Sequence, residues 1–184
     1  MQTDTAYNSR DDKVRLISFF TALCMFLSAV EYAIPKPLPF LRLGLTNLPV
    51  LLSLSVLKKR DVLLLILLKI LAQGFVSGTL FSYIFLFSAA GSFASGITML
   101  ALYTVLKNSK YISVIGLSLA GSLANNLSQI ALARLIIFGK NTRFIAPVLL
   151  ASGLVTGVLI GIFAEFFTSK SKWFSLIRGR YEAS

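Results

Sequence analysis

Residues 144–167 read "FIAPVLLASGLVTGVLIGIFAEFF", a long apolar stretch with Glu165 as its only charged side chain. A helix that crosses a membrane requires about 20 apolar residues, so this stretch predicts a span. Gly153, Gly157 and Gly161 recur at every fourth residue and share one face of the helix, where a second helix can approach closely. The stretch therefore predicts a bundle of membrane helices.

The composition of the whole chain agrees with this prediction. Hydrophobic residues make up 56% of the 184 residues, charged residues make up 14%, and the mean hydropathy is +0.81. Soluble domains have about 45–50% apolar and about 25% charged residues. We expect an all-α integral membrane protein with six transmembrane helices, near residues 14–33, 43–57, 61–77, 83–106, 111–138 and 144–167.

The second of these spans is short, and an irregular segment precedes it. The sequence "PKPLPFLRLGLTNLP" at 35–49 contains four prolines. Proline interrupts helices, so a loop or a broken helix that enters the membrane is expected here.

The basic residues predict the orientation of the bundle. Twelve of the 18 lie in the terminal segments and in the connections near 58–60 and 107–110, and four lie in the alternate connections. Because positive charge favours the cytoplasmic side, both termini are expected in the cytoplasm. We therefore interpret the net charge of +11 as orienting the protein in the lipid membrane, and we expect no nucleic-acid partner. The expected domains are a mobile N-terminus (1–13), a six-helix membrane domain (14–167) and a basic cytoplasmic tail (168–184).

Several kinds of chemistry lack the residues they need. The chain has no histidine, and its one cysteine, Cys24, lies within the first span, which excludes a disulfide framework and imidazole–metal sites. No phosphate-binding loop is present, and the adjacent acidic pair Asp11 and Asp12 lies outside the membrane. We therefore expect no catalytic centre, no metal site and no covalently bound cofactor.

Polar residues in the fifth span form one stripe. At 100° per residue, five of them fall within about a 100° arc. They are Ser118, Ser122, Asn125, Asn126 and Gln129. Such a stripe faces either neighbouring helices, as hydrogen-bonding glue, or a ligand site. One or two amides suffice for glue, so the ligand site is the favoured interpretation.

Other polar residues extend this predicted site. Lys69 and Gln73 lie one turn apart in the third span, and a lysine so deep in a membrane is a candidate functional residue. Arg134 lies near the outer end of its helix, where it either contacts ligand or reaches the lipid headgroups. Glu31 is a candidate partner for Arg42 or Arg134. The uncharged segment "QGFVSGTLFSY" at 73–83 offers hydroxyls and the aromatic residues Phe75, Phe81 and Tyr83 to a ligand.

Four motifs carry a resemblance to a known family. They are "RLGLTNLPVLLSL" at 42–54, "SGTLFS" at 77–82, "GSLANNLSQ" at 121–129 and "SGLVTGVLIG" at 152–161. In this order they resemble the proteins called heptaprenyl diphosphate synthase component I, also known as Gx transporters. Two positions depart from the family pattern: Asn125 stands where a histidine is expected, and Ser128 where a glycine is expected. Any chemistry that depends on that histidine is in doubt here.

The family is similar in layout to the substrate-binding S components of energy-coupling factor (ECF) vitamin transporters. The resemblance implies a multi-pass protein of the bacterial cytoplasmic membrane, with a pocket near the outer face and a small-molecule cargo. It implies that Ala29 and Ala33 dock a transmembrane coupling subunit, which carries ATPases. It also implies a flavin as the transported ligand.

The residues expected to line the pocket come from the third and fifth spans and the segments beside them. They are Asn125, Asn126, Gln129, Lys69, Gln73, Ser77, Thr79, Ser122, Asn47 and Arg134. Two other functions remain open: an accessory subunit of heptaprenyl diphosphate synthase, and a scaffold subunit of a membrane redox complex.

Overall fold

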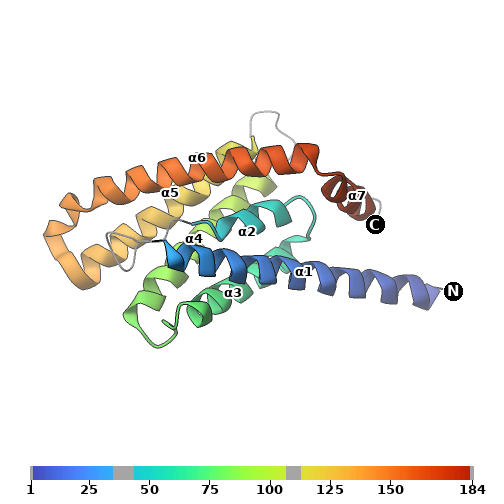
Figure 1. Ribbon diagram of the computed structural model, residues 1–184, viewed down its shortest axis with the longest axis horizontal. Coiled ribbons are helices and arrows are strands. Elements are labelled where there is room, and N and C mark those ends of the chain that lie inside the picture. Colours follow the sequence, from blue (N-terminus) through green and yellow to red (C-terminus); the bar gives the residue numbers. More distant parts are fainter. Residues whose placement is uncertain (1, 35–43, 107–112, 183–184) are drawn as a thin grey trace.

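The computed structural model describes residues 2–34, 44–106 and 113–182 (Figure 1). Within these residues the chain is a bundle of helices, which confirms the all-α prediction. The helices are α1 (Gln2–Ala33), α2 (Asn47–Ser53), α3 (Lys59–Val76), α4 (Tyr83–Leu106), α5 (Val114–Ala133), η1 (Arg134–Phe138), η2 (Gly139–Phe144), α6 (Ala146–Lys170) and α7 (Lys172–Glu182).

Three of the helices are long and apolar enough to cross a membrane. They are the Asp11–Ala33 part of α1, α4 and α6. This length and composition mark the chain as a membrane protein. Helices α3 and α5 have 18 and 20 residues and carry the charged and amide side chains discussed below.

Helix α1 begins much earlier than the first predicted span. Residues 2–13, expected to be mobile, form its first turns. They contain neither glycine nor proline, so nothing in the sequence ends the helix there. These turns extend beyond the rest of the bundle (Figure 1).

Helix α2 takes the place of the second predicted span, 43–57. It has only seven residues, and Pro49 is accommodated in its first turn. At its end, Ser53 Oγ donates to the Val50 carbonyl at 2.7 Å and Ser55 Oγ donates to the Leu52 carbonyl at 3.1 Å, which satisfies carbonyls near the helix terminus. Figure 1 shows α2 inside the bundle, where it contacts α1, α3, α4, α5 and α6. Residues 35–43 of the proline-rich segment, with Arg42, lie outside the described residues.

Helices α5 and α6 pack along the predicted glycine face. A Cβ at Gly157 would lie 2.8 Å from Ser122 Oγ, and one at Gly161 would lie 2.7 Å from Ile115 Cα. Any larger residue would force the helices apart, so the glycine pattern is confirmed as a helix contact. Beyond Ala133 the α-helix continues as the π-helix η1, so the fifth predicted span changes its helix type before residue 138.

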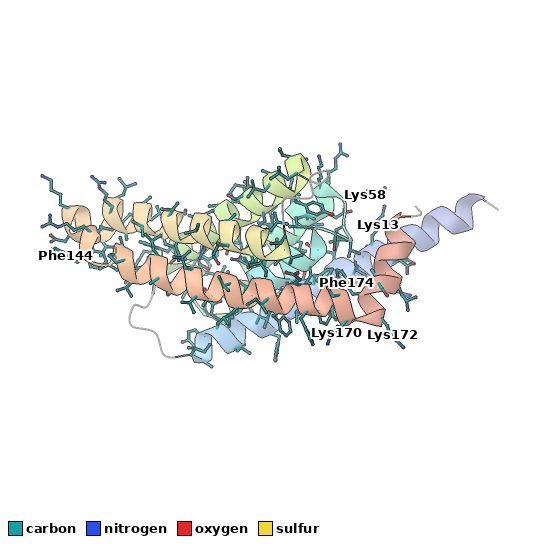
Figure 2. The ribbon with its side chains drawn as sticks, turned by 90° about the horizontal axis from the view of Figure 1, so that it is seen from above. Lys13, Lys58, Phe144, Lys170, Lys172 and Phe174 are labelled. Atoms are coloured by element: carbon teal, nitrogen blue, oxygen red, sulfur yellow. The ribbon has the colours of Figure 1, made fainter. Side chains whose placement is uncertain are left out.

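Several lysines mark one end of the bundle. Lys13, Lys58, Lys170 and Lys172 lie at one end, hereafter the basic end, and Phe144 lies at the other (Figure 2). Helix α1 begins and α7 ends on the side of the basic end (Figure 1). Helix α7 was not predicted within the tail 168–184. Its Phe174 is 2% exposed and packs against the Phe167 ring, with 6.1 Å between the centroids.

Candidate functional site

The polar stripe of α5 is buried, as the helical spacing predicted. Each of its five side chains is 5% exposed or less. Burial of amides and hydroxyls is costly unless they find hydrogen-bond partners. The partners they find therefore separate the two interpretations of the stripe.

Two members of the stripe hydrogen-bond to α6. Ser118 Oγ donates to the Gly157 carbonyl at 2.7 Å, and Asn126 Nδ2 donates to the Leu149 carbonyl at 2.5 Å. A Cβ built at Gly153 would overlap the Asn126 amide. Ser122 also faces α6, beside Gly157. This side of the stripe joins α5 to α6.

The other side of the stripe faces α4. A Cβ at Gly91 would overlap Asn125 Oδ1 and lie 3.2 Å from Gln129 Nε2. Asn125 Nδ2 donates to Asn126 Oδ1 at 3.4 Å. Gln129 is fully buried, and neither its amide nitrogen nor its amide oxygen has a hydrogen-bond partner.

Helix α4 carries further unpaired groups. The hydroxyls of Ser88 and Ser95 are buried without a partner, and these residues share a helix face with Gly91 and Ser92. An unsatisfied buried polar group costs about 1–3 kcal/mol, so native structures contain few of them. Four of the six such side-chain atoms in the described residues belong to α4 and α5, and Ser28 Oγ and Asn47 Nδ2 are the other two. The four atoms are hydrogen-bonding capacity that these two helices do not use. We call Ser88, Ser95 and Gln129 the unpaired cluster.

A second buried network surrounds the entry to α2. Lys69 Nζ donates to Asn47 Oδ1, and Gln73 Nε2 donates to Thr46 Oγ1 at 3.2 Å. Ser92 Oγ donates to Gln73 Oε1 at 3.1 Å, so α4 links this network to the unpaired cluster. Lys69 and Gln73 are 1% and 2% exposed. The structure therefore brings Lys69 and Gln73 together with Asn47 in one network.

Helix α1 completes this network. The Glu31 carboxylate accepts a hydrogen bond from the Leu45 backbone N–H at 3.1 Å, and Cys24 Sγ lies 3.9 Å from the Thr46 carbonyl. Both side chains are buried. Of the two predicted partners of Glu31, Arg42 is outside the described residues and Arg134 is exposed on the surface. The chain turns into α2 at Gly44, which has φ +86°, a backbone conformation that favours glycine.

The remaining predicted residues lie around the networks or apart from them. Ser77 Oγ donates to the Gln73 carbonyl at 2.7 Å and lies 2.8 Å from Thr79 Oγ1, which places both half-buried hydroxyls one turn beyond Gln73. Arg134 is not brought to the site. Phe75, Phe81 and Tyr83 are exposed and do not lie over the polar groups. Ala29 and Ala33 are exposed on α1.

Sequence reasoning missed Thr46, Ser88, Ser92 and Ser95. A signal for the serines was present, because Ser88, Gly91, Ser92 and Ser95 recur at helical spacing in α4 and place small polar residues on one face. Thr46 carries no comparable signal, since its partner Gln73 is 27 positions away in the sequence.

Comparison with known families agrees with the motifs. A family model described as heptaprenyl diphosphate synthase component I matches residues 20–167. The chain belongs to this family. The matched region of this component I protein contains both buried networks. No curated protein and no solved structure was found to match the chain.

Proposed function

We propose that this component I protein is the substrate-binding subunit of a membrane transporter, similar to an ECF S component. The observation that carries the proposal is the fully buried Gln129 amide, which lacks any partner and lies against Gly91 of α4, the helix that also carries the unpaired hydroxyls of Ser88 and Ser95. Glue between helices requires bonded side chains, as at Asn126. An unbonded amide is suited to a ligand.

The chemistry of the unpaired cluster indicates the kind of cargo. A primary amide offers two N–H donors and one carbonyl acceptor, which match a ring edge with alternating acceptors and donors. The pyrimidine-like edge of a flavin has this pattern, so riboflavin, FMN and FAD are the first candidates. Lys69 supplies positive charge for an anionic group of the cargo. The amides pack against Gly91 of α4, so cargo binding separates α4 from α5 at this point.

The proposed arrangement has six spans with both termini in the cytoplasm of a bacterium. In this orientation the basic end faces inward, and the unpaired cluster lies in the outer half of the membrane. Exposed Ala29 and Ala33 on α1 support docking of a transmembrane coupling subunit, to which ATPases bind.

The proposal is tested on the full-length protein purified in mild detergent. Mass spectrometry and visible absorbance identify any ligand that co-purifies, and quenching of flavin fluorescence measures binding of the three flavins. We expect Gln129→Leu to weaken cargo binding by at least about tenfold, because the ligand's polar edge is then left unpaired. The matched control is Asn141→Leu, since Asn141 is an exposed amide in η2.

Two outcomes contradict the proposal at different levels. If another small molecule co-purifies and flavins do not bind, the flavin is wrong and the binding subunit stands. If no ligand is retained and Gln129→Leu changes only stability, the unpaired cluster is structural and the transporter proposal fails.

The family description favours a second candidate, a membrane accessory subunit of heptaprenyl diphosphate synthase. Co-expression with a catalytic prenyl synthase tests it. An accessory subunit raises the yield of long-chain prenyl diphosphate, whereas a transport subunit leaves it unchanged.

A further inference from the structure

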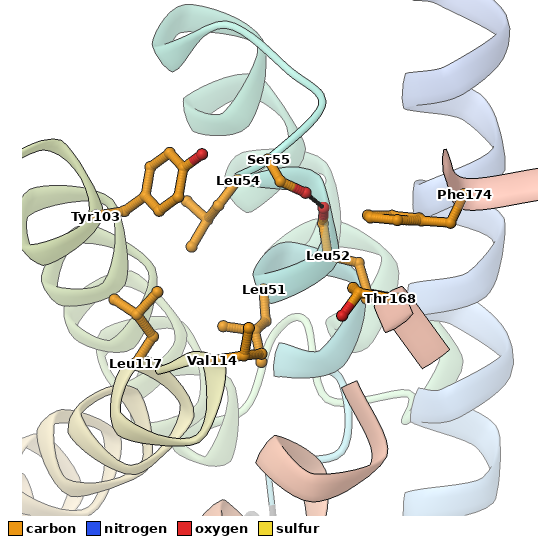
Figure 3. A pocket seen from close by; sticks show the side chains of 9 residues that line it. All are labelled: Leu51, Leu52, Leu54, Ser55, Tyr103, Val114, Leu117, Thr168 and Phe174. Carbon is orange, nitrogen blue, oxygen red and sulfur yellow. Dashed lines mark hydrogen bonds between the residues drawn. The ribbon is translucent and has the colours of Figure 1, made fainter. Parts of the chain in front are cut away.

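A pocket at the basic end is separate from both polar networks. It lies between α2, α4, α5, α6 and α7, with Leu51, Leu54, Val114, Leu117 and Phe174 among its walls (Figure 3). Val114 begins α5 and Gln129 lies 15 residues further along it, so the pocket and the unpaired cluster are about 22 Å apart along the helix.

The walls of this pocket suit hydrocarbon. Three lining residues, Ser55, Tyr103 and Thr168, carry hydroxyls. Two of these hydroxyls are already used within the chain: Ser55 Oγ donates to the Leu52 carbonyl and Thr168 Oγ1 donates to the Glu165 carbonyl, both at 3.1 Å. The cavity measures about 80 Å³, roughly half of the 150 Å³ of an apolar cavity that takes up benzene. It therefore has room for the end of a hydrocarbon chain.

Positive charge lies close to the pocket in the sequence and at the same end of the bundle. Lys58 follows Ser55 by three residues, Lys170 follows Thr168 by two, and Lys172 precedes Phe174 by two. Figure 2 shows these lysines at the same end as Phe174. Lys170 Nζ lies 4.6 Å above the Phe166 ring, which leaves Lys58 and Lys172 as the better anion contacts. Both are exposed.

We propose that the basic end binds an amphiphile with a phosphate-bearing headgroup. The end of its hydrocarbon chain enters the pocket beside Phe174, and Lys58 and Lys172 bind the phosphate. A prenyl diphosphate and an anionic phospholipid share this chemistry. The site is independent of the proposed cargo site, so failure of either leaves the other intact.

The test uses the full-length protein in nanodiscs of phosphatidylcholine. Trp173 is the only tryptophan of the chain and adjoins Phe174 in sequence, so its fluorescence is the readout. The probes are farnesyl diphosphate, farnesol, inorganic diphosphate and nanodiscs that contain phosphatidylglycerol. We expect a saturable change in the Trp173 fluorescence with farnesyl diphosphate or with phosphatidylglycerol. The amphiphile that binds more tightly is then identified as the source of the phosphate-bearing headgroup. Binding of farnesol or inorganic diphosphate with equal affinity would overturn the proposal, as would no binding of either amphiphile.

Two sets of variants assign the binding to this site. Lys58→Gln combined with Lys172→Gln should weaken binding by roughly tenfold, because each lysine near an anionic surface contributes to affinity. The matched control is Lys140→Gln with Arg143→Gln, which removes two exposed charges near Phe144 at the opposite end and should change binding less than twofold. Equal losses in both pairs would mean unspecific attraction and would overturn the proposal.

A substitution that fills the pocket tests whether the hydrocarbon chain enters it. Val114 is half-buried at the start of α5, and Val114→Phe should abolish the preference for farnesyl diphosphate over inorganic diphosphate. Thermal unfolding verifies that the variant is folded. An unchanged preference in the folded variant would show that the chain does not enter the pocket.

Discussion

Asn126 and Gln129 are both buried amides on the same face of α5, and they differ in what they contact. Asn126 faces α6, where its amide donates to the Leu149 carbonyl and Gly153 leaves space for it. Gln129 faces α4 and has no hydrogen-bond partner. The comparison teaches that the α5–α6 contact is completed by the chain itself, whereas Gln129 brings to the α4–α5 contact an amide that the chain leaves unpaired.

The largest effect on stability is expected from Gly153→Ala, which introduces a side chain into the close contact between α5 and α6. The added Cβ overlaps the Asn126 amide, so the variant should lose about 3 kcal/mol of unfolding free energy or fail to accumulate as folded protein. Unfolding in a detergent series measures the loss. Gly116→Ala is the control, because its Cβ would meet only Ser113 Oγ at an ordinary 3.7 Å. Equal losses would show that the α5–α6 contact is not close-packed.

Lys69→Met should have the next largest effect, in the network around α2. It removes the donor to Asn47 from the interior, and loss of a charged hydrogen bond costs about 1.5–3 kcal/mol. Thermal unfolding measures the cost. Lys59→Met is the control, since Lys59 is exposed at the start of α3. No difference between the two variants would contradict a role for Lys69 in holding residues 44–47.

Substitution of the two amides by leucine is expected to change the free energy of unfolding in opposite directions. Asn126→Leu should destabilise the protein by about 1 kcal/mol through loss of its bond to Leu149. Gln129→Leu should leave ligand-free stability unchanged or raise it, because it removes two unpaired buried atoms. Thermal unfolding of both variants without ligand gives the comparison. Destabilisation by Gln129→Leu equal to that by Asn126→Leu would refute the distinction between the two contacts.

The smallest effect is expected from Ser88→Ala. This change removes one unpaired buried hydroxyl of α4 and should stabilise the ligand-free protein by about 0.5–1 kcal/mol. Ser118→Ala is the matched control, because its hydroxyl is bonded to the Gly157 carbonyl and its loss should destabilise. Equal changes in unfolding temperature for the two variants would count against the unpaired cluster.

Much of the bundle follows from the sequence because helical periodicity is local. The buried face of α5 and the glycine face of α6 depend on spacing along single helices, and both are found as predicted. The choice of partner is not local. Asn126 reaches a carbonyl 23 positions away and Gln129 reaches none, and this difference depends on how three helices are aligned.

Two other features also depend on contacts that the sequence does not reveal. Residues 43–57 have the apolar composition of a span, but Pro49 and the serine hydroxyls at 53 and 55 favour a short helix that only its neighbours stabilise. The Glu31 carboxylate accepts a hydrogen bond from the Leu45 backbone N–H, a group that every residue except proline carries and that therefore leaves no signal in the sequence. Its predicted pairing with Arg42 lies outside the described residues.

Cys24 gives this protein a built-in chemical reporter. It is the only cysteine, is 1% exposed, and lies against the Thr46 carbonyl. A maleimide can reach its sulfur only during excursions in which α1 parts from residues 44–47. The rate of alkylation of the unaltered chain therefore times these excursions, and slower alkylation on addition of a ligand would register its binding without any label introduced by mutagenesis.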